Sequence, residues 1–357
     1  MAPTQRVKRL RNRALAKTDI INSEPELLWA RSWLASTAEP WYIIRRAQTI
    51  ASVLRGMTPV IDDDELIVGK YCFRPLSRQE QAEVEAWCRV GATAVPKDLG
   101  QKAHMAIDYD KLLRLGIKGI RRQIEEYRAK LDVSRPDELE RDAFYRACLI
   151  CLDAAVAYAN SYADLAESMA KEERSDVRRQ ELLRIAATCR RVPWEPAASF
   201  YEALQTVHFT TFCLCAGQRL VLFQLGRPDR YLLPYIRRDV ARGTLAPEQA
   251  QELIDCLCIM LNEYTPRGLA VGFMVGGRDA SGMDVTNELT SMFIESIGHT
   301  RLSYPGIGLC WNSDTPSDLM QRACGLLATG ASHPALFNDD IITAGLVQAG
   351  LPFAEAC

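Results

Sequence analysis

The stretch from Gly268 to Ser296 constrains the fold more than any other part of the chain. It opens with the largely apolar residues Leu269 to Val275, which are too few for a buried helix and have a glycine on either side. This pattern predicts a strand that is buried on both faces. Further glycines then indicate a tight loop. Apolar residues recur at helical spacing from Val285, which makes Asp284 the predicted N-cap of a helix.

A strand, a glycine loop and a helix in this order could also hold a phosphate. Gly277 and Gly282 have the spacing of a P-loop, but Met283 and Asp284 stand where that motif needs Lys and then Ser or Thr. Asp279 and Asp284 would also repel a phosphate. The glycines therefore predict a structural turn and not a nucleotide site.

The composition is typical of an ordinary soluble globular protein, with 48% hydrophobic and 25% charged residues. The formal net charge of −2 argues against nucleic-acid binding. We expect no membrane span, because no run approaches the roughly 18 apolar residues that a span requires, and no signal peptide is visible. The 12 cysteines lie scattered through apolar segments, which favours reduced thiols in the cytoplasm.

The first 17 residues carry six basic side chains and no acidic one. A transit peptide or a nucleic-acid-binding arm would look similar, but transit peptides are rich in serine and this stretch has none. Residues 1–22 are therefore predicted to form a solvated basic helix that leads into the domain. Asp62, Asp63 and Asp64 suggest a cation site, yet consecutive side chains diverge on any regular element. We predict a solvated turn there.

Helix signals dominate from Ser23 to Leu131 and recur later in the chain. Ser23 with Pro25 predicts one helix start, and Ser77 with Glu80 forms a capping box. A second helix is predicted from Trp41 to Leu54 and a long one over residues 140–173. The face of the long helix that is predicted to be buried consists of Phe144, Cys148, Cys151, Ala155, Tyr158, Tyr162 and Leu165. Near the C-terminus, Thr315 is the predicted cap of a helix that has Pro316 at its first position.

The pair Cys148 and Cys151 invites a redox or zinc interpretation. The pair lies inside a predicted helix and not at its N-terminus, where the helix dipole would lower a thiol pKa. A zinc site would need a second ligand pair at a recognisable spacing. We therefore predict no metal site and expect these cysteines to pack as small apolar residues, together with Cys213, Cys215, Cys256 and Cys258.

The central stretch resembles the pyruvate formate-lyase domain of the glycyl radical enzymes. The residues VGGRDASGMDVTNEL match that family's signature VGG-x-D-x-x-G-x-D-x-TNEL. Similar segments lie at residues 61–70, 140–173, 181–209 and 226–232, so the resemblance covers nearly the whole chain but only about the first half of such an enzyme. It implies a mixed α/β fold for residues 1–357 as one domain, mainly helical up to about Phe209, followed by part of the family's α/β barrel.

The resemblance also implies a substrate site. Residues 101–120 are similar to a family segment whose histidine contacts the substrate, which points to His104, although Ala103 replaces the family's glycine. The strand before Gly226 faces the substrate in the family; here it offers Val221, Leu222 and Phe223. This apolar wall favours a substrate with an apolar or aromatic portion, such as an arylacetate. The alternatives are a structural histidine and an ordinary buried strand.

In the family, a Gly-Cys-Val-Glu loop and a distant radical-bearing glycine follow the part that resembles this chain, so we expect no catalytic residue within residues 1–357. The resemblance implies the N-terminal, truncated portion of a glycyl radical enzyme of the lyase or acyltransferase class, expected to be inactive alone: a radical lyase, dehydratase or decarboxylase. The alternative is a non-catalytic scaffold. Expected partners are a small-molecule substrate, the missing C-terminal half, possibly a second copy, and a radical S-adenosylmethionine activase that installs the glycyl radical; no bound cofactor is expected.

Overall fold

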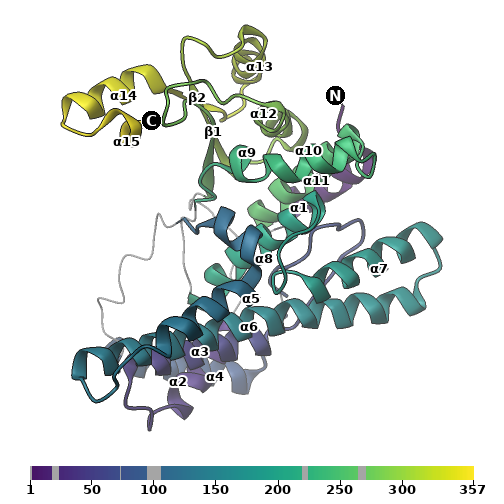
Figure 1. Cartoon of the computed structure of the whole chain (residues 1–357). Coiled ribbons are helices and arrows are strands. Elements are labelled where there is room, and N and C mark those ends of the chain that lie inside the picture. Colours follow the sequence, from purple (N-terminus) through teal and green to yellow (C-terminus); the bar gives the residue numbers. More distant parts are fainter. Residues whose placement is uncertain (1, 18–23, 73, 95–105, 219–223, 264–270) are drawn as a thin grey trace.

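The computed structural model describes residues 2–17, 24–72, 74–94, 106–218, 224–263 and 271–357 (Figure 1). Most of the described chain is helical. The helices are α1 (Gln5–Ala16), α2 (Glu24–Ala35), α3 (Tyr42–Gly56), α4 (Arg78–Ala94), α5 (Tyr109–Arg128), α6 (Pro136–Glu172), α7 (Asp176–Arg191), α8 (Phe200–Gln218), α9 (Pro228–Tyr231), α10 (Leu233–Ala241), α11 (Pro247–Glu263), α12 (Glu288–Thr300), α13 (Ser317–Ala328), α14 (Asp339–Gln348) and α15 (Phe353–Ala356).

The long helix α6 is the axis of the helical body and packs against α3 and α7. The helix predicted over residues 140–173 is confirmed, but its predicted buried face is only partly right. Tyr158 and Tyr162 are buried, whereas Phe144 is 54% exposed. The remaining buried positions are mostly alanines, such as Ala154 and Ala166. Small side chains let neighbouring helices approach closely, so the interface follows the alanines and not the larger residues.

A small parallel sheet follows the helical body. It consists of β1 (Gly272–Gly276), β2 (Gly306–Trp311) and β3 (Ala335–Asn338), in that order. The helices α12 and α13 are the crossovers that parallel strands require. The predicted strand is confirmed from Gly272 onwards and is almost wholly buried; Leu269 and Ala270 lie outside the described residues. The described strands form an open sheet, and a closed barrel is not seen among them.

Two predicted helix caps are wrong. Helix α12 begins at Glu288 and is capped by Asn287, whose side chain accepts hydrogen bonds from the amides of the first turn. Asp284 lies earlier, in an antiparallel bridge with Arg278, and its carboxylate accepts a hydrogen bond from Asn312 Nδ2 at 2.8 Å. Helix α13 begins at Ser317, one residue after the predicted first position Pro316. The Thr315 hydroxyl accepts a hydrogen bond from the Asn312 amide and so closes the preceding turn instead of capping the helix.

Other local predictions are confirmed. In the capping box before α4, the Ser77 amide donates to Glu80 Oε2 at 2.8 Å and the Glu80 amide donates to Ser77 Oγ at 3.2 Å. Helix α3 covers the predicted range, and α2 begins at Glu24, directly after the undescribed Ser23. No helix in the described ranges combines the length and the apolar character needed to cross a membrane.

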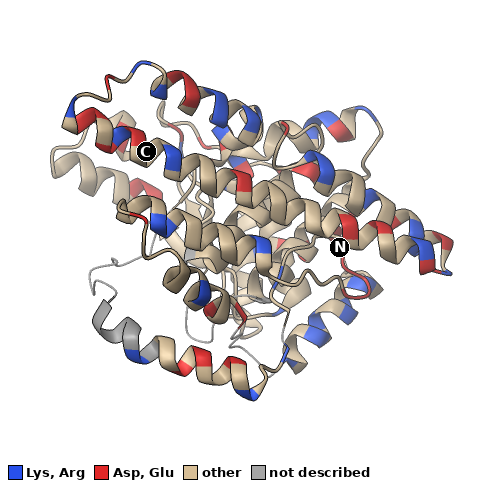
Figure 2. Ribbon diagram, turned by 90° about the horizontal axis from the view of Figure 1, so that it is seen from below, with Lys and Arg blue, Asp and Glu red and all other residues tan. Residues whose placement is uncertain are grey.

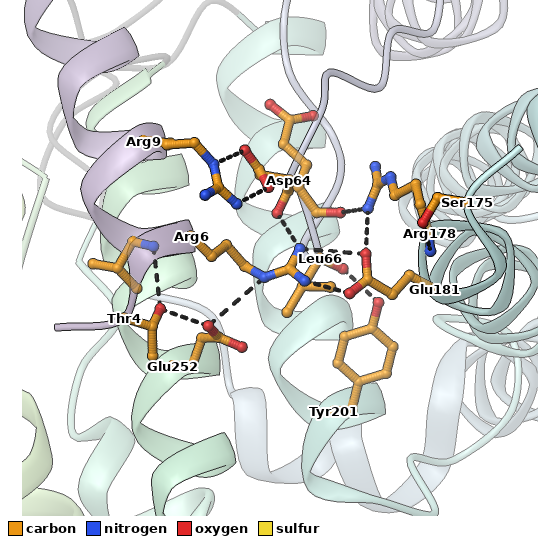
Figure 3. A network of polar contacts seen from close by, with 12 residues as sticks. Thr4, Arg6, Arg9, Asp64, Leu66, Ser175, Arg178, Glu181, Tyr201 and Glu252 are labelled. Atoms are coloured by element: carbon orange, nitrogen blue, oxygen red, sulfur yellow. Dashed lines mark hydrogen bonds and ion pairs between the residues drawn. The ribbon is translucent and has the colours of Figure 1, made fainter. Parts of the chain in front are cut away.

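The N-terminal helix α1 is docked against the body through one face, which corrects the expectation of a helix that is solvated all round (Figure 3). Its residues Val7 and Leu10 are buried in the main core. Arg6 forms an ion pair with Glu181 of α7, and its Nη1 donates to the Asp64 carbonyl at 2.8 Å. The turn at residues 62–64 is only partly solvated, because the Asp64 carboxylate binds Arg9 and the Asp63 carbonyl binds Arg13 of α1.

Charged side chains are otherwise intermixed. Figure 2 shows Lys and Arg alternating with Asp and Glu along the helices that face the viewer. This distribution agrees with the formal net charge of −2. A broad surface of one sign, which a nucleic-acid binder would present, is not visible in that view.

Candidate active site

The predicted substrate residues His104, Val221, Leu222 and Phe223 lie outside the described residues. The residues that follow each of them closely are described. Ala106 forms a parallel bridge with Gln224, and Gln224 forms a parallel bridge with Gly272 of β1. Two backbone bonds continue this pairing, from the Leu225 amide to the Gly272 carbonyl at 3.1 Å and from the Met274 amide to the Gly226 carbonyl at 3.0 Å. The described residues that follow the two predicted stretches therefore pair in parallel beside β1.

Two tyrosines, the buried Tyr109 and the half-buried Tyr231, fix this arrangement to the helical body. Tyr109, at the start of α5, shares a 2.8 Å hydrogen bond with the Thr211 hydroxyl of α8. Its ring stacks on Tyr231 at a centroid distance of 5.3 Å. The Tyr231 hydroxyl donates to the Leu225 carbonyl at 3.0 Å. Burial raises the pKa of both phenols, so both remain protonated donors, and α5 and residues 224–226 are held in one register.

The carboxyl end of β1 contacts a buried aspartate. Asp229 is fully buried, and its Oδ2 accepts hydrogen bonds from the Gly276 amide and the Thr290 hydroxyl, both at 2.6 Å. Burial raises the pKa of the Asp229 carboxyl. Arg227 Nη1 donates to the Gly276 carbonyl at 2.9 Å. The backbone amide and the carbonyl of Gly276 are thus bound by Asp229 and Arg227, which closely follow Gln224.

The signature motif ties this site to the chain after β3. The Arg278 amide donates to Asp339 Oδ2 at 2.8 Å, and Arg278 Nε donates to Asp340 Oδ1 at 2.7 Å. Arg278 Nη1 also binds Asp314 Oδ2 at 2.8 Å, in the loop after β2. The motif therefore holds the ends of all three strands together. This role was not predicted from the sequence, although two aspartates that closely follow an apolar run are a recognisable feature of a strand's carboxyl end.

The cysteines behave as apolar residues. Cys213, Cys215, Cys256 and Cys258 are buried, which confirms the predicted packing. Burial also raises the pKa of the Cys148 thiol, and it raises that of Cys151 to about 11. A neutral thiol is a poor nucleophile and a poor metal ligand at pH 7. Among the residues that the structure describes, no group of three or more His, Cys, Asp and Glu side chains is arranged to hold a metal ion.

An apolar cavity of about 250 Å³ opens between α3, α5, α6 and α8. Ile107, the neighbour of Ala106, lines it together with Leu112, Cys151 and Cys213. Asp108 and Lys111 contribute charged groups to its wall. The cavity is a partly open pocket between helices, and none of its described lining residues lies at the carboxyl ends of the strands, where α/β proteins place their chemistry.

Comparisons with known proteins agree on one family. The family model described as "Pyruvate formate lyase-like" matches residues 3–98 and 81–357. The isethionate sulfite-lyase of Oleidesulfovibrio alaskensis is 33% identical over 264 residues, which are 70% of this chain and 32% of that enzyme. A structure that describes 1,2-propanediol dehydration in Roseburia inulinivorans superposes with a TM-score of 0.90 at 27% identity and covers 100% of this chain. A glycyl radical enzyme from Archaeoglobus fulgidus gives a TM-score of 0.88 at 26% identity and covers 99% of this chain.

The chain spans about half the length of these solved relatives, 53% of the Roseburia chain and 54% of the Archaeoglobus chain. The match includes both the helical body and the parallel sheet with its signature loop. The chain therefore belongs to the pyruvate formate lyase-like family of glycyl radical enzymes.

Proposed function

We propose that this chain supplies the substrate-binding first part of a glycyl radical lyase, dehydratase or decarboxylase that acts on a small organic molecule. His104 and the stretch Val221 to Phe223 contact that substrate. The observation that carries the proposal is the parallel pairing of Ala106 with Gln224. These residues follow the two candidate stretches by two positions and one position, so the pairing supports a shared site at the edge of β1.

The radical-bearing residues belong, in this proposal, to the part of the family fold that lies beyond the matched region, where a radical S-adenosylmethionine activase installs the glycyl radical. The residues of this chain bind and orient the substrate and exclude water. The hydrogen bonds from the Gly276 amide to Asp229 and from Arg278 to Asp340 keep the strand ends fixed. A rigid support of this kind is what accurate positioning of a substrate requires.

The side chains of Val221, Leu222 and Phe223 offer no hydrogen bond to a substrate hydroxyl. A hydroxyl buried against them without a partner would cost about 1–3 kcal/mol. We therefore propose a substrate with an apolar or aromatic portion, such as an arylacetate, and a role for His104 in orienting its carboxylate.

To test this, the chain is co-expressed under anaerobic conditions with the unmatched part of the isethionate sulfite-lyase, which supplies the rest of the fold, and with the activase of that enzyme. The expected result is turnover of an arylacetate in preference to glycerol and choline. Phe223→Ser should lower kcat/KM for the arylacetate roughly tenfold, as expected for a lost apolar contact, whereas Val177→Ser on the distant helix α7 should not. Efficient glycerol turnover that Phe223→Ser leaves unchanged would contradict the assignment.

A spectroscopic measurement tests where the radical resides. The chain alone, incubated anaerobically with the activase, should give no glycyl doublet in its electron paramagnetic resonance spectrum. A doublet from the isolated chain would show that the radical residue lies within residues 1–357.

A further inference from the structure

The apolar cavity between α3, α5, α6 and α8 has room for a small ligand. We call it the helical cavity. Its volume is about 250 Å³, and it is partly open, so a molecule can enter it from solvent. Apolar cavities of about 150 Å³ in other proteins bind benzene. The helical cavity can therefore take an apolar body larger than a single benzene ring.

The wall of the helical cavity favours an aliphatic ligand. Its described residues are aliphatic, apart from Cys151, Cys213, Thr210, Asp108 and Lys111, and they include no aromatic ring. The Thr210 hydroxyl already donates to a carbonyl of its own helix at 2.8 Å. A polar group buried against such a wall would lose its hydrogen bonds to water without replacement. The part of a ligand that enters the cavity must therefore be apolar.

Lys111 brings a positive charge to this apolar wall. It lies half-buried in the first turn of α5. No carboxylate of the described residues forms an ion pair with its ammonium group, whereas Lys118 of the same helix binds Glu195 at 2.8 Å. A half-buried ammonium group without an ion-pair partner in the protein favours an anionic group on the ligand.

Asp108 is the other charged residue of the wall, and it is engaged differently. Its Oδ1 accepts a hydrogen bond from the Lys111 amide at 3.0 Å and caps α5. The residue is also exposed. The negative charge of Asp108 is thus stabilised by the N-terminus of the helix and by water. Of the two charges, that of Lys111 is the one left for a ligand.

We propose that the helical cavity binds a medium-chain aliphatic carboxylate, with its alkyl chain against the apolar wall and its carboxylate on Lys111. Such a ligand suits both features of the site, because the chain is removed from water and the head group pairs with the ammonium group. Neither His104 nor the stretch Val221 to Phe223 is needed for this binding. The site therefore stands or falls independently of the proposed function.

The first experiment compares three probes that share one alkyl chain and differ in the charge of the head group. Octanoate, 1-octanol and octylamine are titrated into the full chain by isothermal titration calorimetry. Octanoate should bind most tightly and octylamine most weakly, because Lys111 attracts an anion and repels a cation. The proposal is overturned if octanoate shows no saturable binding or if octylamine binds at least as tightly as octanoate.

Substitutions of the two charged residues should have opposite effects. Lys111→Met keeps an apolar stem and should weaken octanoate binding roughly threefold to fivefold, as for a partly exposed ion pair, without weakening 1-octanol binding. Asp108→Asn keeps a capping side chain and should strengthen octanoate binding roughly twofold. Lys118→Met, on the same helix but outside the described wall, is the matched control and should change neither affinity. Equal losses for Lys111→Met and Lys118→Met would contradict the assignment to Lys111.

A third measurement locates the ligand. Cys151 lines the helical cavity, whereas the half-buried Cys148 is not among its described lining residues. Octanoate should slow the alkylation of Cys151 by N-ethylmaleimide and leave that of Cys148 unchanged, as measured by fragmentation mass spectrometry. Ala155→Met places a longer side chain in the cavity and should abolish binding of octanoate and 1-octanol while circular dichroism stays unchanged. Octanoate binding that leaves the alkylation of Cys151 unchanged, or that persists in a folded Ala155→Met variant, would place the ligand elsewhere and overturn the proposal.

Discussion

Gly277 shows how a single residue of the signature motif acts through backbone geometry. It adopts φ +84°, and a Cβ at this position would lie 2.7 Å from Asp339 Oδ2 and 3.0 Å from Arg227 Nη1. A side chain would therefore push apart the two groups that hold the strand ends. Gly277 therefore acts by allowing the backbone to approach Asp339 and Arg227 closely.

Gly277→Ala should lower the free energy of unfolding by about 2–4 kcal/mol, because strain at positive φ adds to a steric clash. Gly330→Ala is the matched control. Gly330 has φ +82° but nothing within 4 Å of an added Cβ, so its substitution should cost only about 1–2 kcal/mol. Urea unfolding measures both values. Equal losses would mean that the contacts of Gly277 contribute nothing.

His208 gives a prediction about pH. It is fully buried, its Nε2 donates to the Gly69 carbonyl at 2.6 Å, and burial lowers its pKa from 6.5 to about 4. Because the unfolded chain binds the proton first, the contribution of this group to stability is complete above pH 6.5 and is lost as the pH falls towards 4.

Over this pH range the loss should be about 3 kcal/mol, since one pKa unit corresponds to about 1.4 kcal/mol. His208→Gln keeps a donor for Gly69 and cannot take up the proton. The difference in unfolding free energy between the wild type and this variant should therefore shrink or reverse on acidification. A difference that stays constant with pH would refute the assignment to His208.

At the scale of elements, helix α1 shows what its sequence does not reveal. Its basic residues are typical of a solvated helix, yet Arg6 is only 17% exposed and lies between Glu181 and Glu252. These partners are more than 170 residues away in the chain. No local pattern indicates such partners, so ion pairs between distant elements cannot be predicted from the sequence alone.

Removing Arg6 should therefore destabilise the fold. Arg6→Ala is expected to cost about 1–3 kcal/mol, because partly buried carboxylates lose their partner. Arg11, on the same helix, hydrogen-bonds the side chain of the adjacent Asn12, and Arg11→Ala should change stability by less than about 0.5 kcal/mol. Thermal unfolding of the two variants checks this. Equal effects would mean that the arginine network does not anchor α1.

The sequence predicted the positions of helices and strands better than it predicted their caps and their tertiary contacts. The capping box at Ser77 and the strand that ends before Gly277 follow from local patterns, and the structure has both. The cap of α12 was misplaced because Asp284 and Asn287 are both good caps. The choice between them depends on the bridge of Asp284 with Arg278 and the bond from Asn312, which only the folded chain brings together.

At the scale of the whole molecule, the signature motif and the similar segments predicted the family, and they predicted that the chain matches about half of such an enzyme. The predicted part of a barrel is not seen, because the described strands form an open sheet. For the candidate site, the family resemblance indicated the two stretches that precede Ala106 and Gln224. It did not indicate that the two would pair, because parallel pairing over more than 100 residues depends on the tertiary fold. The polar groups that fix the strand ends were missed for the same reason.

The central claim is that His104 and the stretch Val221 to Phe223 form one substrate site. The chain has four histidines, so ¹⁵N-histidine labelling gives four imidazole groups that His→Gln variants assign. Titration with indole-3-acetate should shift the His104 signal while the buried His208 signal stays unchanged, and Phe223→Ser should weaken the shift. A His104 signal that responds to none of indole-3-acetate, glycerol and isethionate would contradict the account.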